Sequence, residues 1–128
     1  MNRRTFAAGA LLLFVIPAFP QQPAADIAAV TDSDGIPTVA AQMRLLSTRL
    51  ELSDDQQGRL QPILQDLHNA TVKALHDESS SPQDRMASVH AERLRTDKRI
   101  RDFLTDDQKR RLDQVEQEPH PELHGNIN

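Results

Sequence analysis

Leu52-Ser53-Asp54-Asp55-Gln56 is repeated later in the chain as Leu104-Thr105-Asp106-Asp107-Gln108. Each copy lies between two stretches with helical hydrophobic spacing, which places it at a joint between helices, where backbone N–H groups need partners. The order of residues is that of a capping box: the hydroxyl accepts from the glutamine N–H, and the glutamine side chain accepts from the N–H of the cap residue. The repeat therefore predicts that separate helices begin after Ser53 and Thr105.

The residues around each cap support this prediction. The paired aspartates place negative charge at the positive end of the helix dipole, which stabilises each helix by about 0.3–1 kcal/mol per carboxylate. A leucine before the cap usually packs against the fifth residue after it, but those positions hold Gln57 and Lys109. We therefore expect Leu52 and Leu104 to pack on neighbouring helices.

Hydrophobic spacing and turn signals predict four helices. The first carries Val39, Met43, Leu46 and Leu50 on one face and ends near Glu51. The other three are expected from the Ser53 cap to about Glu78, from Pro82 to about Phe103, and from the Thr105 cap to Glu118.

The link between the second and third predicted helices is short, so these two helices should form an antiparallel hairpin. Pro62 lies well inside the second helix, where its ring crowds the carbonyl of Gly58. The apolar stripe keeps its phase on both sides of Pro62, which favours a bend over a break. The expected fold is all-α: an elongated, curved, four-helix assembly with a concave side.

The chain divides into four expected regions. Residues 1–25 resemble a cleaved export signal, with Arg3 and Arg4 before an apolar run too short to span a bilayer. The arginine pair is compatible with the secretory or the twin-arginine route. A flexible leader (26–37), a helical domain (38–118) and a disordered tail (119–128) follow. We expect an exported protein without stable membrane anchoring.

Composition excludes several classes of protein. The chain has no cysteine, so disulfides, thiolate metal sites and cysteine catalysis are ruled out. Its formal net charge is −4, and removal of Arg3 and Arg4 with the signal makes it more acidic, which argues against nucleic-acid binding. Phe103 is the one aromatic residue in the predicted helical domain. A small aliphatic core of this kind favours self-association.

Two such phrases in an exported, cysteine-free helical chain resemble the LTxxQ family of small periplasmic proteins, the Spy/CpxP group. The resemblance covers roughly Thr38 to Glu118; the second phrase fits fully, and the first has Ser53 in place of threonine. It implies a cradle-shaped homodimer that acts as an ATP-independent chaperone on unfolded or stressed envelope proteins. It also implies an alternative, a periplasmic metal-binding stress-response or sensor-accessory protein, because related members respond to or bind zinc and other metals.

Several residues are candidates for function. The motif residues are Leu52, Ser53, Gln56, Leu104, Thr105 and Gln108, and their preferred interpretation is structural capping. The client-binding candidates, which we expect on the concave side, are Met43, Leu46, Met86, Val89, Arg85 and Arg93. For most of the basic residues of the third helix, a solvated face with helix-spaced ion pairs is the simpler interpretation.

Five histidines raise the question of metal binding. His120 and His124 have the four-residue spacing of a helical metal site, but Pro121 and Gly125 argue against a helix there. Ordinary surface histidine is therefore preferred, with no cofactor and with zinc as a minor alternative. The sequence contains no Gly-rich phosphate loop, Ser-x-x-Lys, Gly-x-Ser-x-Gly or His-Glu-x-x-His phrase. We therefore do not expect an enzyme.

Overall fold

The computed structural model describes residues 30–125, which are helical apart from turns and joints. The helices are α2 (Val39–Arg49), α3 (Asp54–Leu75), α4 (Pro82–Arg101), α5 (Asp106–Gln117) and α6 (Pro121–His124). Within these residues the only extended pairing is an isolated antiparallel bridge between Thr31 and Pro37. The all-α prediction is confirmed for this part of the chain.

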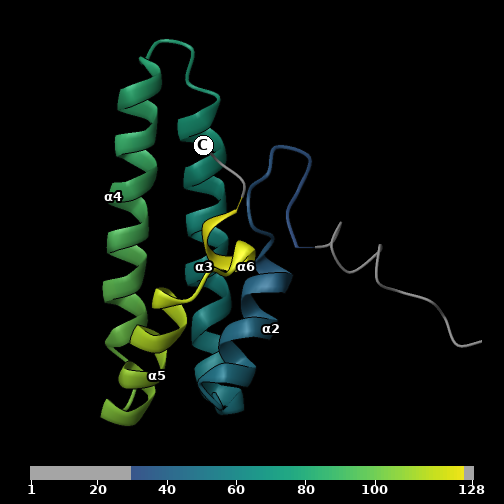
Figure 1. Ribbon diagram of the computed structural model, residues 1–128, viewed down its shortest axis with the longest axis vertical. Helices are drawn as coiled ribbons and strands as arrows, with labels where there is room; N and C mark the ends of the chain where they lie inside the picture. Colours follow the sequence, from purple (N-terminus) through teal and green to yellow (C-terminus); the bar gives the residue numbers. More distant parts are fainter. Residues whose placement is uncertain (1–29, 126–128) are drawn as a thin grey trace, which may run out of the picture.

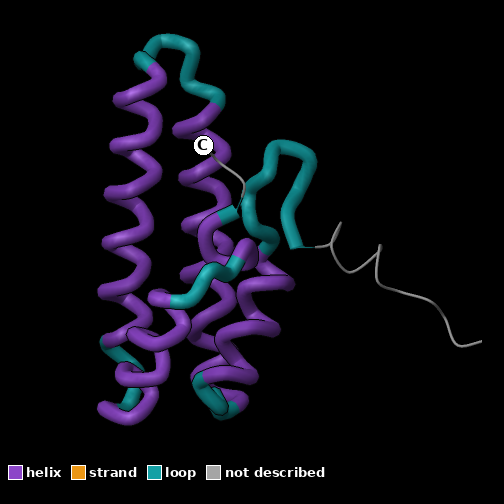
Figure 2. The backbone as a smooth tube through the Cα atoms, in the orientation of Figure 1, coloured by secondary structure: helices purple, strands orange, loops and turns teal. Residues whose placement is uncertain are grey.

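The two long helices α3 and α4 lie side by side and run in opposite directions, joined by the loop at the top of Figure 1. Helix α2 packs against α3 and also contacts α5 and α6. These three shorter helices gather near the lower and middle parts of the hairpin, so its upper end extends beyond them (Figure 2). No helix within residues 30–125 combines the length and apolar character that crossing a bilayer requires.

Helices α3, α4 and α5 begin where the sequence predicts, because each has a side-chain cap. Both capping boxes are present: Ser53 accepts from the Gln56 N–H, and Thr105 accepts from the Gln108 N–H. Ser81 caps α4 in the same way, and Pro82 occupies its first turn. Since an N-cap contributes about 1 kcal/mol, the three caps fix where α3, α4 and α5 start.

Three helices end earlier than predicted, and the first of them is α2, which stops at Arg49 and not near Glu51. Helix α3 stops at Leu75 and not near Glu78, because Asp77 accepts hydrogen bonds from the side chains of Ser79 and Ser80 and forms the turn itself. Helix α4 ends at Arg101, two residues before Phe103. Helix α3 continues without interruption through Pro62, as the phase of its apolar stripe indicates.

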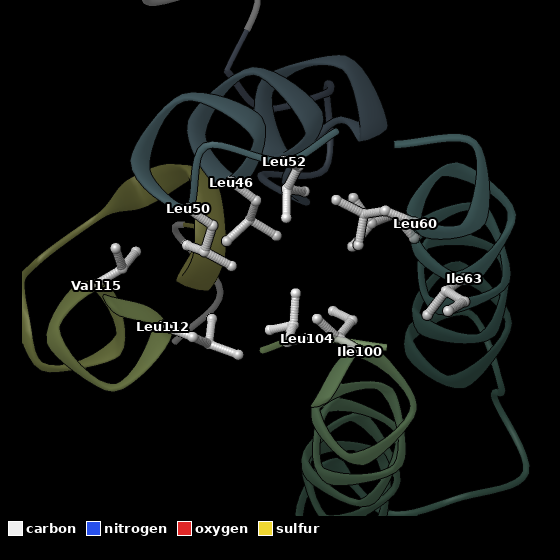
Figure 3. Close-up of a cluster of buried hydrophobic side chains, with 10 residues drawn as sticks. Leu46, Leu50, Leu52, Leu60, Ile63, Ile100, Leu104, Leu112 and Val115 are labelled. Atoms are coloured by element: carbon white, nitrogen blue, oxygen red, sulfur yellow. The ribbon is translucent and has the colours of Figure 1, made fainter. Parts of the chain in front are cut away.

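The main core is aliphatic and lies around the two repeated phrases (Figure 3). Leu52 and Leu104 are 7% and 8% exposed and pack in this cluster, which confirms that each leucine finds partners on neighbouring helices. Phe103 packs against the edge of the cluster. The remaining buried members are Leu46, Leu50, Leu60, Ile63, Leu64, Ile100, Leu112 and Val115.

The segments outside the predicted helical domain are more ordered than the sequence suggests. Residues 30–37, placed in the expected flexible leader, form a tight turn in which the Asp32 side chain accepts hydrogen bonds from the N–H groups of Asp34 and Ile36. Ile36 is 2% exposed. The rest of that leader, and the proposed export signal, lie outside the described residues.

The expected disordered tail contains helix α6, against the prediction. Leu123 packs on the main core, and the carbonyl of His124 accepts a hydrogen bond of 2.9 Å from Arg93 Nη2. Gly125 then lies directly against the 30–37 turn: a Cβ at this position would be 2.4 Å from the Gly35 oxygen. The tail therefore closes over the turn that precedes α2.

Candidate functional site

The two repeated phrases meet each other in space through their glutamines. Gln56 Nε2 donates to Gln108 Oε1 at 2.8 Å, and Gln108 Nε2 donates to Gln56 Oε1 at 2.9 Å. Each Oε1 also accepts from its own cap, the N–H of Ser53 or Thr105, at 3.0 Å. The second amide hydrogens reach across the joint, from Gln56 to the Phe103 carbonyl and from Gln108 to the Leu50 carbonyl.

This crossed pair joins the beginning of α3 to the beginning of α5. Sequence reasoning predicted the two capping boxes separately and missed their contact, although the repetition of one phrase was a signal that both copies could occupy equivalent places. A half-buried side-chain amide is costly to leave without hydrogen-bond partners. The four hydrogen bonds that the two glutamine side chains donate therefore fix the two joints relative to each other. This supports a structural role for the motif.

A cleft of about 420 Å³ opens between the helices, with lining residues from α2, α3, α4, α5 and α6. Its volume lies in the range of small-molecule sites, about 300–1,000 Å³. Most of the wall is aliphatic, and Leu94 lies at its edge with 59% of its surface exposed. The apolar side chains that line it are Leu46, Leu64, Leu67, Leu94, Ile100, Leu112 and Leu123.

An arginine and three carboxylates stand at the α4–α5 side of the cleft. Arg101 Nε contacts Asp97 at 2.8 Å, and its Nη2 contacts Asp113 at 2.8 Å and Glu116 at 3.1 Å. Both Asp97 and Glu116 border the cleft. One guanidinium thus pairs with three carboxyl groups, so this group of side chains has more acidic than basic members.

Burial and the neighbouring Asp97 raise the pKa of Glu116 to about 7. Burial also opposes ionisation of Asp97, but hydrogen bonds from Glu116 and Arg101 outweigh it and lower the Asp97 pKa. Asp97 Oδ1 is buried and receives no hydrogen bond from an N–H or hydroxyl group of the described chain. The raised pKa of Glu116 and the lowered pKa of Asp97 mean that Glu116 is the member of this pair that keeps its proton to higher pH.

The predicted client-binding residues do not share one surface. Leu46 is 2% exposed and Val89 is not exposed at all, so both belong to the interior, and their assignment as contact residues is wrong for this chain. They are buried because α2 packs on α3 and because α3 covers the inner face of α4. Met43 packs partly buried against the main core.

The other three candidates lie on α4 and are half-buried. Arg85 donates to the Asp77 carbonyl at the hairpin turn, whereas Arg93 borders the cleft. Met86, His90 and Leu94 follow one another at four-residue spacing, so they lie on the same face of α4. Leu94, whose side chain is exposed, was not among the candidates predicted from the sequence.

Many of the remaining basic residues form helix-spaced or interhelical ion pairs, as the simpler interpretation of the basic face predicts. Examples are Arg99 with Asp66 at 3.1 Å and Arg110 with Asp107 at 2.9 Å. Their side chains are half or more exposed, and such pairs contribute about 0–1 kcal/mol each.

The histidines are distributed over separate places. His68 and His76 lie beside Asp32 and Asp34 of the 30–37 turn, at 3.8 and 3.2 Å. His120 contacts Glu118 at 2.7 Å, while His124, the other metal candidate, lies at the end of α6 and borders the cleft. Within residues 30–125 no three histidine or acidic side chains gather closely enough to hold a metal ion.

Comparison of the chain with protein-family models, with curated proteins and with solved structures gave no match.

Proposed function

We propose that this protein is an ATP-independent periplasmic chaperone that holds unfolded or stressed envelope polypeptides through many weak apolar and charged contacts. The observation that carries the proposal is the surface around Leu94. This leucine is the one large apolar residue among residues 30–125 that is strongly exposed. It lies between Arg93 and Arg95, with Lys98 one turn further along α4.

An exposed leucine among cations suits binding to an unfolded chain. The apolar contact recognises side chains that a folded client buries, and the surrounding charge attracts acidic segments at long range. Since a shallow surface of this kind makes few specific contacts, clients of differing sequence can bind and be released. The resemblance of the two phrases to the LTxxQ family is consistent with this activity, and the proposed role requires no catalytic residue.

We further propose that two chains form a homodimer in which the extended ends of the α3–α4 hairpins contribute to a concave surface. Between residues 70 and 90 the buried side chains are Thr71 and Val89. A second copy would cover the half-buried Val72, Leu75 and Met86 in this part of the hairpin. Sedimentation velocity over a range of protein concentrations tests the dimer directly.

Light scattering from an aggregating, unfolded client tests the chaperone proposal. We expect suppression at a few-fold excess of the protein, and a clear loss of suppression in Leu94→Gln. Arg59→Gln is the matched control, because it introduces the same residue at an exposed position of α3 outside residues 70–90 and should leave the activity unchanged. Aggregation that proceeds at the same rate with and without the wild-type protein would refute the proposal.

A separate experiment tests the alternative that the protein binds a metal ion. Calorimetry with zinc on the wild-type chain and on His120→Ala separates a site at the α6 end from non-specific binding. No heat with the wild-type chain would remove this alternative.

A further inference from the structure

The end of the cleft nearest α6 carries hydrogen-bond donors that the described chain does not use. Gln42, on α2, is only 4% exposed, yet its side-chain amide makes no hydrogen bond within residues 30–125. The amide atoms are not among the fully buried polar atoms of the described chain, so they are accessible from the cleft and can bind a ligand or water there. Gln42 borders the large cleft, so its amide is placed to meet a molecule bound there.

Arg93 stands at the same end. A second, small cleft adjoins the first, and both are bordered by Gln42, Arg93, Leu67 and Leu123. Arg93 donates to the His124 carbonyl, and no ion pair with a carboxylate is found for it among the described residues. Burial of the guanidinium lowers the pKa of Arg93. A ligand group that pairs with the Arg93 guanidinium would therefore carry a negative charge.

The remaining wall of the cleft is different in character. Leu46, Leu64 and Leu112 are each at most 3% exposed and line this wall, so they offer apolar contact in addition to the donors. The acids at the α4–α5 side already have Arg101 as a partner. A ligand that fits both the donors and this wall therefore has an anionic head and an apolar body.

We propose that this cleft binds a small carboxylate with an unbranched apolar tail. The carboxylate accepts hydrogen bonds from the Arg93 guanidinium and the Gln42 amide, and the tail lies along the leucine wall. Charge-assisted hydrogen bonds of a guanidinium to a carboxylate are among the stronger polar contacts in proteins. The site adjoins the proposed chaperone surface, because Arg93 and Leu94 also border this cleft, but its ligand is a small molecule and not a polypeptide.

Calorimetry of the full chain with decanoate tests the proposal, with decylamine and a trileucine peptide as comparison ligands. We expect saturable binding of decanoate and much weaker binding of the other two. Arg93→Met should weaken decanoate binding about tenfold or more, and Gln42→Leu several-fold. Arg95→Met, an exposed position on the same helix, should bind as the wild type does.

Arg93→Met also removes the bond to α6, so Arg93→Lys serves as a second variant, because it keeps a cation that can still donate to the His124 carbonyl. Its affinity for decanoate should remain within a few-fold of wild type. Absence of decanoate binding, equal binding of decylamine, tighter binding of the peptide, or an unchanged affinity in Arg93→Met would each overturn the proposal. Because no client is present, these results do not depend on the aggregation assay.

Discussion

At the scale of single residues, the glutamine of the repeated phrase does more than close a capping box. Gln56 and Gln108 each bond their own cap, the other glutamine and a carbonyl of the opposite joint. A capping box alone needs only the first of these bonds. The crossed pair therefore predicts that the two residues are energetically coupled.

A double-mutant cycle with Gln56→Ala and Gln108→Ala measures this coupling. Each single substitution should lower the free energy of unfolding by about 1–3 kcal/mol, because it leaves partner groups unpaired. The double variant should lose less than the sum of the two, with a coupling of about 0.5–3 kcal/mol. Urea denaturation gives all four values.

The exposed glutamines Gln61 in α3 and Gln114 in α5 provide the matched controls. Their alanine variants should change stability by no more than about 0.5 kcal/mol, alone or together. If the losses for Gln56 and Gln108 simply add, the contact between the two phrases carries no energy and our account of the joint is wrong.

Glu116 gives a prediction about pH. Its pKa is about 7 in the folded protein against a usual value of 4.5, so between about pH 4.5 and about pH 7 the folded state binds this proton more tightly than the unfolded state. The contribution of Glu116 to stability is therefore fully present at low pH and is lost as the pH rises through 7. Its side chain is 39% exposed, so solvent reduces the size of the effect.

Glu116→Gln, which mimics the protonated acid, should remove this contribution. From about pH 5 to about pH 8 the wild-type urea midpoint should fall more than that of the variant. The histidines titrate in the same range in both proteins, so the difference between the two profiles isolates Glu116. Parallel profiles would contradict the raised pKa.

At the scale of elements, the tail shows a contact that the sequence concealed. Gly125 has φ of +62°, and a Cβ there would lie 2.4 Å from the Gly35 oxygen and 2.8 Å from Pro37 Cδ. Both the backbone conformation and the close approach favour glycine. The contact holds the end of α6 against the 30–37 turn.

We expect Gly125→Ala to detach α6 and to expose the half-buried Leu123, with a loss of stability of about 1–3 kcal/mol. Gly58→Ala is the opposite control: Gly58 lies inside α3 with nothing within 4 Å of a built Cβ, so alanine should stabilise the helix by about 0.5–1 kcal/mol. Thermal denaturation ranks the three proteins. A neutral Gly125→Ala would mean that the tail is not docked in solution.

Some features of these elements could be predicted from the sequence, and others could not. Helix starts were predictable, because Ser53, Ser81 and Thr105 carry local capping signals. The order of residues 30–37 and of α6 was not, since each is stabilised by a segment about ninety residues away in the chain. The cleft was equally hidden: its donors, Gln42 and Arg93, come from different helices and have no common spacing.

At the scale of the whole molecule, the core is concentrated at one end. The ten buried residues of the main cluster come from the joints and from the neighbouring ends of the helices (Figure 3). The other end of the α3–α4 hairpin, residues 70–90, contains two buried side chains, Thr71 and Val89. A single chain should therefore be much less stable at this end than around the joints.

Native-state hydrogen exchange tests this difference. In dilute protein, the amides of residues 70–90 should exchange through local openings, at free energies well below that of global unfolding, whereas those of residues 56–66 should approach the global value. If two hairpins cover each other in a dimer, protection of residues 70–90 should rise with protein concentration, while residues 56–66 change little. Equal protection of both segments in monomeric protein would contradict this account, because the few buried contacts at the free end of the hairpin cannot supply the same stability as the aliphatic core.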